Sequence, residues 1–538
     1  MQNLWKPLKK TYRAEMLLDL PPASAFMYRT SNNMVQILSG PSVFSPPGYD
    51  AEYISQNLIV VGDMNTRRYI LAGAVTAKRS MSYFKLIKKG RFHSIIVEQP
   101  HIQEGMEPEE VVVLEGDDWR ELMIRYAEQA AEKMGVKPID PEKNVTGYCS
   151  WYYYYAGVSE ADFNENLAVL AKAHRESEFA PQVMQIDDGY QPFQGDWLKQ
   201  NERWSSPMSE VAKKIIAADM TPGIWTMPLL ASTASEVFTQ HPDWFVKGAD
   251  GQALAMRGWS PAPDHLWCCL DATNPEVREH LKNVFQTFYS WGYRYFKMDG
   301  LGFCMPEGRY FDPSVTPLEA FRLGLKTIRE AVPDAYLLGC CPPFMACMGY
   351  VDACRVSPDT SRYWRMPTPE QPVNSESSPG YPGICNSLHA TLSNWFLYDR
   401  FFRADPDALM ARQDNAFYTF GEARISVLTG IVTGVCITSD HLGTIAPERM
   451  ALLERAAKYR LRDVRPFDWY PDTWAQVFTG KLDGKPAAAI FNDSETPRHY
   501  DLAAMGFENG VEELLHPMGK ISGELVLEAH DGALIVAG

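Results

Sequence analysis

Between residues 145 and 440 the chain repeats one pattern, a short apolar segment typical of a buried strand followed by an amphipathic segment typical of a helix. Strands that alternate with helices form parallel sheets, because each helix carries the chain back to begin the next strand in the same direction. Strands are predicted over 146–151, 183–187, 222–225, 295–299, 336–339, 353–357, 394–398 and 435–438. Helices are predicted between most of them, for example over 160–174, 209–218, 275–289, 318–331 and 446–461.

Eight such strands in roughly 320 residues fit a central (β/α)8 TIM barrel, an α/β fold. The alternative is a doubly wound open sheet. Folds of that kind often bind nucleotides through a glycine-rich phosphate loop, and the sequence contains no such loop. The pattern therefore favours the barrel.

The sequence on either side of the barrel has a different character. Residues 1–140 contain β-rich runs separated at short intervals by Gly, Pro and Asn, which predicts an antiparallel β-sandwich, and a helix is predicted over 119–134. Prolines near residue 140 indicate a linker. From residue 465 a β pattern returns. The predicted division is therefore 1–140 (sandwich), 141–464 (barrel) and 465–538 (small C-terminal β-sheet domain).

Charge and cysteine usage limit the possible partners and location. The chain has 67 acidic and 51 basic residues, a formal charge of −16 that repels nucleic acid and anionic lipid, so neither partner is expected. The longest uncharged run, 425–439, is too short to span a bilayer and predicts buried core. The N-terminus lacks a signal-peptide pattern, and the ten cysteines include no CxxC pair. We therefore expect a cytoplasmic enzyme without disulfides or a cofactor; the oligomeric state stays open.

In a (β/α)8 barrel the active site lies at the carboxyl ends of the strands. Ionisable residues gather at four of these predicted ends. They are Asp187 and Asp188 on the second strand, Lys297 and Asp299 on the fourth, Arg355 and Asp359 on the sixth, and Asp440 on the eighth.

Lys297 and Asp299 stand two residues apart on a strand and so point the same way. A neighbouring ammonium lowers the pKa of a carboxyl, as a carboxylate nucleophile requires. The alternative is a structural ion pair. Asp359 would supply the second carboxyl, a general acid; two such carboxyls about 5–5.5 Å apart indicate a retaining glycosidase, and a wider spacing an inverting one.

Asp187 and Asp188 are adjacent and begin on opposite faces of a strand, unless the strand ends before them. Paired carboxylates are good acceptors for two neighbouring sugar hydroxyls. One of the two could instead be a turn or helix-capping residue. A metal site is less favoured, because no histidine accompanies the pair. The long loop 227–270, with three tryptophans at 244, 259 and 267, is a candidate lid, although its tryptophans could equally anchor the loop itself.

Eight segments, in this order, resemble glycoside hydrolase family 36, the α-galactosidases, and especially its short bacterial members. They are CSWYYY (149–154), QIDDGY (185–190) followed by GDW (195–197), PGIWTMP (222–228), HPDW (241–244), GYRYFKMDG (292–300), GCCPP (339–343), VDACRVSPDTSRYW (351–364) and YDRFFRADPD (398–407).

The resemblance implies a role for each matching residue. Asp299 would be the nucleophile and Asp359 the general acid/base of a retaining hydrolase. Asp187 and Asp188 would accept hydrogen bonds from the sugar 4- and 6-hydroxyls. The remaining binding residues would be Trp151, Tyr152 and Trp225 around the galactosyl ring, Lys297 and Arg355 at hydroxyls near the reacting carbon, and Cys340 close to the 2-hydroxyl.

The chain departs from the family pattern at a few positions near the site. Ser357 stands where short relatives carry Gly, Gly300 replaces a bulky residue after the nucleophile, and Cys341 replaces a smaller residue. These departures bear on the substituent at carbon 2 and on the leaving-group side. An aromatic from the N-terminal domain can also reach the site in the family; Trp5 and Tyr53 are the candidates here.

The predicted function is a retaining, exo-acting α-galactosidase for small raffinose- or melibiose-type galactosides. The close alternative is the same chemistry on a 2-amino or 2-acetamido galactoside. Two more distant alternatives are a barrel that binds galactosides without catalysis, and a metal-dependent hydrolase that uses Asp187, Asp188 and Asp299.

Overall fold

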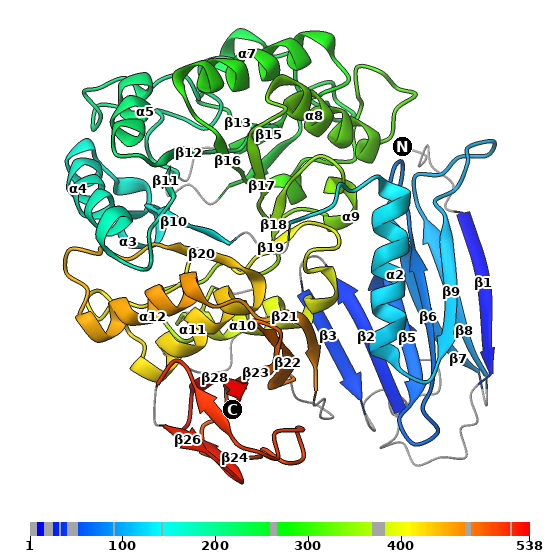
Figure 1. Ribbon diagram of the computed structural model, residues 1–538. Coiled ribbons are helices and arrows are strands. Elements are labelled where there is room, and N and C mark those ends of the chain that lie inside the picture. The colour runs from blue at the N-terminus through cyan, green and yellow to red at the C-terminus, as the bar shows by residue number, and fades with distance from the viewer. Residues whose placement is uncertain are drawn as a thin grey trace.

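The computed structural model describes residues 8–15, 25–31, 34–39, 52–89, 92–140, 144–258, 266–367, 382–467, 475–516 and 519–538. Side chains are described within these ranges for residues 54–87 and from residue 94 onwards. Two antiparallel sheets at the N-terminus and a further antiparallel sheet at the C-terminus flank a central assembly of parallel strands and helices (Figure 1).

The central sheet has eight parallel strands, as predicted. They are β10 (Val145–Cys149), β11 (Val183–Ile186), β12 (Thr221–Thr226), β16 (Tyr295–Met298), β17 (Tyr336–Gly339), β18 (Ala353–Arg355), β19 (Arg403–Asp405) and β20 (Val435–Thr438). Their spatial order is β19-β18-β17-β16-β12-β11-β10-β20. The ring closes just after β19, where the Leu409 N–H donates to the Ile437 carbonyl at 2.7 Å. The fold class is thus confirmed as a TIM barrel with flanking β domains.

Helices surround the strands and begin where the sequence offers capping residues. The barrel helices of two turns or more are α4 (Glu160–Glu176), α5 (Met208–Ala217), α7 (Pro275–Trp291), α8 (Pro317–Ala331), α10 (Ile384–Ser393), α11 (Phe420–Thr433) and α12 (Pro447–Lys458). At α7 the Asn274 side chain accepts from the Glu276 N–H and Pro275 occupies the first turn, the predicted start.

The predicted seventh strand, 394–398, is wrong. This segment forms a short 3-10 helix, η4 (Trp395–Leu397), and the strand is β19, which begins at Arg403. A short apolar run fits a buried helix as well as a strand, and here Trp395 packs edge-on against Trp119 at 6.2 Å. Strand β19 was not predicted because its sequence is polar. Its Arg403 is nevertheless buried, where it forms an ion pair with Asp399.

In its described residues, the N-terminal part contains two antiparallel sheets and the helix α2. The first sheet is ordered β1-β8-β7-β4 and the second β3-β2-β5-β6-β9. Their strands are β1 (Leu8–Glu15), β2 (Ala25–Ser31), β3 (Met34–Ser39), β4 (Glu52–Gln56), β5 (Leu58–Asp63), β6 (Arg68–Ala74), β7 (Tyr83–Lys89), β8 (Phe92–Gln99) and β9 (Val111–Gly116). Helix α2 (Trp119–Met134), with the predicted bounds, lies between the second sheet and the barrel (Figure 1).

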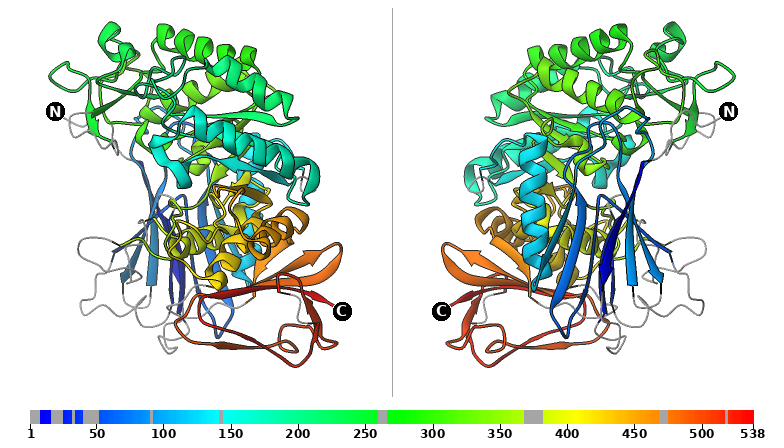
Figure 2. Two further views of the ribbon diagram at one scale, coloured as in Figure 1. Left: turned by 90° about the vertical axis from the view of Figure 1, so that its left-hand side faces the viewer. Right: turned by 90° about the vertical axis from the view of Figure 1, so that its right-hand side faces the viewer.

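The C-terminal part forms a six-stranded sheet beneath the barrel, as seen from two sides in Figure 2. Its order is β21 (Arg462–Pro466), β22 (Val477–Leu482), β23 (Lys485–Asn492), β28 (Asp531–Ala537), β25 (Val511–Glu513) and β26 (Lys520–Ile521), and β24 (Arg498–Asp501) pairs with β27 (Glu524–Leu527). Strand β21 crosses the predicted limit at residues 464/465, and the division into domains stays a prediction.

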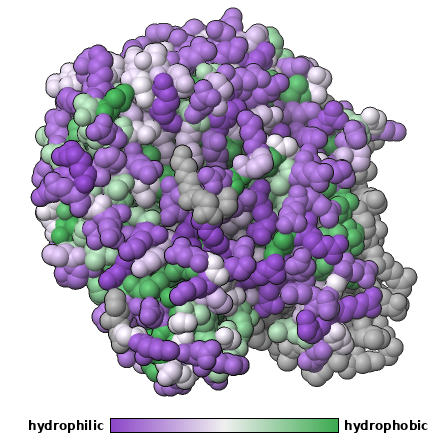
Figure 3. Space-filling view, in the orientation of Figure 1, coloured by the Kyte–Doolittle hydropathy of each residue, from purple (hydrophilic) through white to green (hydrophobic). Residues whose placement is uncertain are grey.

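Among the described residues, no helix has the length and apolar character needed to cross a bilayer. The uncharged run 425–439 is buried in α11 and β20, as expected. Hydrophilic residues cover most of the molecular face shown in Figure 3, and hydrophobic residues occur there as separate patches.

Candidate active site

Every predicted site residue lies at the carboxyl end of a barrel strand or directly after it, and therefore at one mouth of the barrel. Trp151 and Tyr152 follow β10, Asp187 and Asp188 follow β11, Trp225 is on β12, Lys297 and Asp299 are on and after β16, Cys340 follows β17, and Arg355 and Asp359 are on and after β18.

Asp299 accepts hydrogen bonds from strand β12 and from the turn after β16. The Trp225 indole N–H donates to Oδ2 at 3.1 Å and the Gly300 N–H to Oδ1 at 2.7 Å. Burial raises the pKa of Asp299, but the positive charges of Arg355 and Lys297, with hydrogen bonds from the Gly300 N–H and Cys340, outweigh it, so the pKa lies below its ordinary value. Asp299 is thus kept as a carboxylate.

The conformation of Gly300 explains why this position departs from the family pattern. Its φ is 68°, in the left-handed region that favours glycine. An added Cβ would also lie 2.9 Å from a methyl carbon of Leu230. Glycine therefore lets the backbone N–H turn back onto the Asp299 carboxylate.

The Lys297 ammonium, on β16, lies 2.9 Å from a carboxylate oxygen of Asp187, which follows β11. Both side chains are buried. The Asp187 Oδ2 that receives Lys297 also accepts from Cys149 Sγ at 3.2 Å and from Gln185 at 2.6 Å. Its Oδ1 accepts the Asp188 N–H at 2.9 Å. Both oxygens of Asp187 thus already accept hydrogen bonds within the protein. The positive charge of Lys297, which lowers the pKa of Asp299, is therefore shared with Asp187.

Asp188 has different surroundings. Strand β11 ends at Ile186, so both aspartates lie beyond it, as the sequence allowed. Gln191 and Gln194 donate to the Asp188 carboxylate at 2.6 and 3.4 Å, and no cation among the described residues forms an ion pair with it. Burial, reinforced by the charges of Asp187 and Asp299, raises the pKa of Asp188 to about 6. Asp188 is therefore an acceptor with capacity for a further partner.

Arg355 connects Asp359 to a carboxylate from the next strand. Its Nη1 lies 2.7 Å from an Asp359 oxygen and 3.6 Å from an Asp407 oxygen, and its Nη2 donates to Cys341 Sγ at 2.7 Å. Burial raises the pKa of Asp359; Arg355 opposes this shift, while the negative charges of Asp407 and Asp299 add to it. The net result is a raised pKa, which suits a group that must donate a proton.

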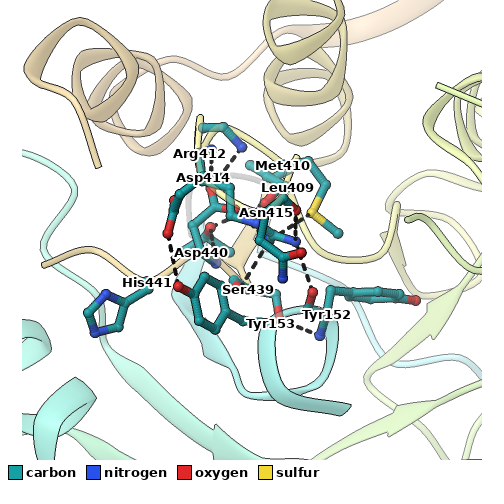
Figure 4. A network of polar contacts seen from close by, with 12 residues as sticks. Tyr152, Tyr153, Leu409, Met410, Arg412, Asp414, Asn415, Ser439, Asp440 and His441 are labelled. Atoms are coloured by element: carbon teal, nitrogen blue, oxygen red, sulfur yellow. Dashed lines mark hydrogen bonds and ion pairs between the residues drawn. The ribbon is translucent and has the colours of Figure 1, made fainter. Parts of the chain in front are cut away.

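Tyr152 is fixed at three points. Its N–H donates to Ser439 Oγ at 2.8 Å, its carbonyl accepts from Arg412 at 2.9 Å, and its hydroxyl donates to Asp407. Arg412 is itself paired with Asp440 at 3.0 Å, and both side chains are fully buried (Figure 4). Asp440 therefore supports the wall of the site from behind.

Aromatic rings and thiols complete the walls. Trp225 packs edge-on against Trp197, with ring centroids 5.8 Å apart. Asp299, Cys340 and Cys341 each place one potential ligand atom within 4.8 Å of the others. This group differs from the metal-binding set considered above, which is Asp187, Asp188 and Asp299. In that set the Lys297 ammonium lies beside Asp187, where a metal ion would have to bind. Two buried cations close to Asp299 disfavour a metal ion there electrostatically.

In the loop after β12, the described tryptophans anchor the chain. The loop contains a small antiparallel sheet of β13 (Leu230–Ser232), β15 (Leu266–Cys269) and β14 (Ala255–Arg257). Trp244 is buried, stacks on His241 at 3.7 Å and donates to Glu276 at 2.9 Å. Trp267 is also buried. Trp259 lies outside the described residues.

Reasoning from the sequence missed several residues that organise the site. Asp407 lies inside a quoted motif, YDRFFRADPD, but no role was assigned to it, because the strand that precedes it, β19, was not predicted. Arg412 carried no signal in the sequence, because its partners are distant in sequence. The candidates Trp5 and Tyr53 lie outside the residues whose side chains are described.

Comparison with known families identifies the region that carries the candidate nucleophile. A family model described as Melibiase matches residues 160–300. Among curated proteins, the chain is 26% identical over 129 residues to the A type blood alpha-D-galactosamine galactosaminidase of Flavonifractor plautii, and 24% identical over 131 residues to the alpha-galactosidase of Escherichia coli. Each match covers 23% of this chain, but only 12% and 17% of those relatives.

Solved structures resemble the chain over a far greater length. The α-galactosidase TtGalA from Thermus thermophilus, in complex with p-nitrophenyl alpha-D-galactopyranoside, has a TM-score of 0.67 at 23% identity and covers 89% of this chain and 93% of its own. The family 36 α-galactosidase AgaA from Geobacillus stearothermophilus has a TM-score of 0.63 at 11% identity, covering 98% and 76%. These structures confirm the fold, and with the family-model match they confirm the predicted resemblance.

Proposed function

We propose that this chain is a retaining α-galactosidase that removes terminal α-linked galactose from small galactosides of the raffinose and melibiose type. One observation carries the proposal: the barrel mouth holds two carboxyls in different surroundings. Asp299 accepts from the Trp225 indole and the Gly300 N–H, whereas Asp359 shares the Arg355 guanidinium with the Asp407 carboxylate. In these surroundings the pKa of Asp299 is lowered and the pKa of Asp359 raised, as a nucleophile and a general acid need at one pH.

In the first step, the Asp299 carboxylate attacks the anomeric carbon while Asp359 gives its proton to the departing glycosidic oxygen. The C–O bond to the aglycone breaks, and a β-galactosyl ester forms on Asp299. In the second step, Asp359, now a carboxylate, takes a proton from water. The resulting hydroxide attacks the anomeric carbon, and Asp299 leaves as a carboxylate.

The sugar would be held by the side chains gathered at the barrel mouth. Asp188 would accept from the axial 4-hydroxyl or the 6-hydroxyl, with Asp187 as its partner, while Trp151, Tyr152 and Trp225 would surround the ring. A glucoside, with an equatorial 4-hydroxyl, would leave a buried acceptor without its donor, and this favours galactosides. Lys297, Arg355 and Cys340 would face hydroxyls near the reacting carbon.

The galactosaminidase relative makes a 2-amino or 2-acetamido galactoside the alternative substrate. The substituent at carbon 2 would lie near Cys340. The neighbouring Cys341 thiol, which accepts from Arg355, fills part of this region and favours the smaller hydroxyl. We also propose a cytoplasmic, bacterial enzyme, which accords with ten free cysteines.

The test is release of nitrophenol from nitrophenyl α-galactoside by the wild type and by Asp299→Asn. We expect turnover by the wild type and a loss of about a thousandfold or more in the variant. Asp312→Asn is the matched control, because the Asp312 carboxyl also has a lowered pKa but accepts from Ser314 in its own turn, away from the barrel mouth; its rate should stay near wild type.

Three further measurements distinguish this function from its alternatives. If only the α-N-acetylgalactosaminide is hydrolysed, the substrate sugar is the 2-acetamido galactoside and not galactose. Loss of activity in a strong chelator would indicate the metal-dependent alternative. Galactose binding by calorimetry without turnover of any glycoside would leave a binding protein and contradict the proposal.

A further inference from the structure

A cavity of about 400 Å³ lies where the N-terminal sheets meet the barrel. Leu58, Met81 and Tyr83 line it from the N-terminal side, and Phe303 and Phe344 from the loops after β16 and β17. Its volume is within the range of small-molecule sites. None of the roles assigned above uses this space.

The cavity adjoins the reacting centre through Cys341. This residue lines the cavity, and its Sγ lies within 4.8 Å of an Asp299 carboxylate oxygen. The two loops touch there: a Cβ added to Gly302, three residues after Asp299, would lie 2.8 Å from the Cys341 carbonyl oxygen. Cys341 also accepts from Arg355, which is paired with Asp359, so the cavity lies beside both the candidate nucleophile and the candidate acid.

The walls are suited to an apolar group. The side chains named above are aromatic or aliphatic, and Phe303 is 49% exposed, so part of its ring is accessible to a bound group. The one orphaned polar atom that we find on the described walls is Asn57 Oδ1, which is buried and has no hydrogen-bond partner. A sugar with hydroxyls on every side would lose hydrogen bonds with water here without replacing them.

We propose that this cavity is the leaving-group subsite and that it receives an apolar aglycone, the alkyl or aryl group of an α-galactoside. The inference rests on the proposed function and narrows its substrate class from raffinose-type oligosaccharides towards alkyl and aryl galactosides.

A series of alkyl α-galactosides tests this proposal, because methyl, hexyl and octyl leaving groups differ little in acidity and differ mainly in apolar surface. Each would be assayed below its micelle-forming concentration, with melibiose as the polar comparison. We expect kcat/KM to rise at least about tenfold from methyl to octyl, because each buried methylene contributes favourably to binding. A flat series, with melibiose equal to octyl galactoside, would overturn the inference.

Two variants locate the effect. Phe303→Lys places a charge in the wall and should remove most of the octyl advantage while methyl galactoside turnover is retained. Phe311→Lys is the matched control, since Phe311 is 64% exposed and does not line the cavity. Equal loss in both variants would overturn the assignment.

Tyr83→Ser tests the opposite wall and serves if Phe303→Lys fails to fold. It should lower the octyl-to-methyl ratio, because Tyr83 belongs to the N-terminal sheet; an unchanged ratio would count against a site between the two parts. Failure of the proposed function would look different: no α-galactoside of any chain length would then be hydrolysed.

Discussion

Asp188 is a buried carboxyl for which the described part of the chain provides no ion-pair partner. The folded chain raises its pKa to about 6, chiefly through burial, so the native state binds this proton more tightly than the unfolded chain does. Native stability therefore falls as the pH rises from the ordinary carboxyl value to about 6, and it stays at the lower level above that. This loss of stability is explained if the ionised Asp188 carboxylate accepts a hydrogen bond from a sugar hydroxyl.

Asp188→Asn should consequently stabilise the protein while harming its activity. At pH 8 we expect a gain on the order of 2 kcal/mol in unfolding free energy, which vanishes near pH 4 where the wild-type residue is protonated. The kcat/KM for galactosides should fall about tenfold to a hundredfold. Thermal unfolding at both pH values checks the first part; equal shifts at pH 4 and pH 8 would contradict it.

The Arg355 guanidinium lies between the carboxylates of Asp359 and Asp407, 2.7 Å from the first and 3.6 Å from the second. The negative charge of Asp407 raises the pKa of Asp359, so Asp407→Asn should lower that pKa and leave more of Arg355 to pair with Asp359. The alkaline limb of kcat/KM reports deprotonation of the general acid and should move to lower pH by about half to one unit.

A pH–rate profile of Asp407→Asn checks this. Asp414→Asn is the control, because Asp414 bonds Tyr153 and Thr444 rather than Arg355, and its alkaline limb should stay in place. A purely structural role for Asp407 would lower the rate at every pH without moving the limb.

Sequence reasoning reached the residues at strand ends but not their partners. Asp299 and Asp359 could be identified because each follows an apolar strand. Lys297 also points to the mouth of the barrel, yet its close partner is Asp187, 110 residues away, and no local pattern could reveal that. The same holds for Tyr152 and Asp407, which are 255 residues apart.

At the scale of elements, the seventh strand shows where periodicity fails. The segment 394–398 is apolar because it packs against α2, and Arg403–Asp405 is polar although buried, because ion pairs and backbone bonds satisfy it. The other seven strands were found because their cores are apolar.

The loop after β19 and the end of β20 are joined by the buried Arg412–Asp440 pair. Arg412→Met should destabilise the protein by roughly 3–5 kcal/mol, because Asp440 would be left buried and unpaired. Adding Asp440→Asn should recover part of the loss. The surface pair of Lys213 with Glu210 offers a control, and Lys213→Met should change stability by about 0.5 kcal/mol or less. Denaturant unfolding midpoints of the variants measure these changes in stability. Equal destabilisation by Arg412→Met and Lys213→Met would contradict the predicted difference between the buried and the surface pair.

At the scale of the whole molecule, one hydrophobic core joins the three parts. Buried residues from the N-terminal sheets, α2, the barrel and β22 and β23 form a single contiguous cluster. Tyr126 on α2 contacts both Phe396 and Phe401, with ring centroids 6.4 and 6.5 Å away. The parts should therefore depend on each other for stability.

Calorimetry should accordingly show the N-terminal sheets and the barrel unfolding in one transition. Tyr126→Ala, which removes a buried ring at their junction, should lower that transition without splitting it. Two well-separated transitions in the wild type would contradict a shared core.

The central claim is that Asp299 is the nucleophile and Asp359 the acid/base of a retaining hydrolase. Azide rescue tests it most directly, with an activated aryl α-galactoside as substrate. In Asp299→Gly, azide should attack in place of the carboxylate and give β-galactosyl azide. In Asp359→Gly, azide should attack the galactosyl ester on Asp299 and give α-galactosyl azide. Proton NMR of the products identifies each anomer, and the reverse assignment, or one anomer from both variants, would contradict the account.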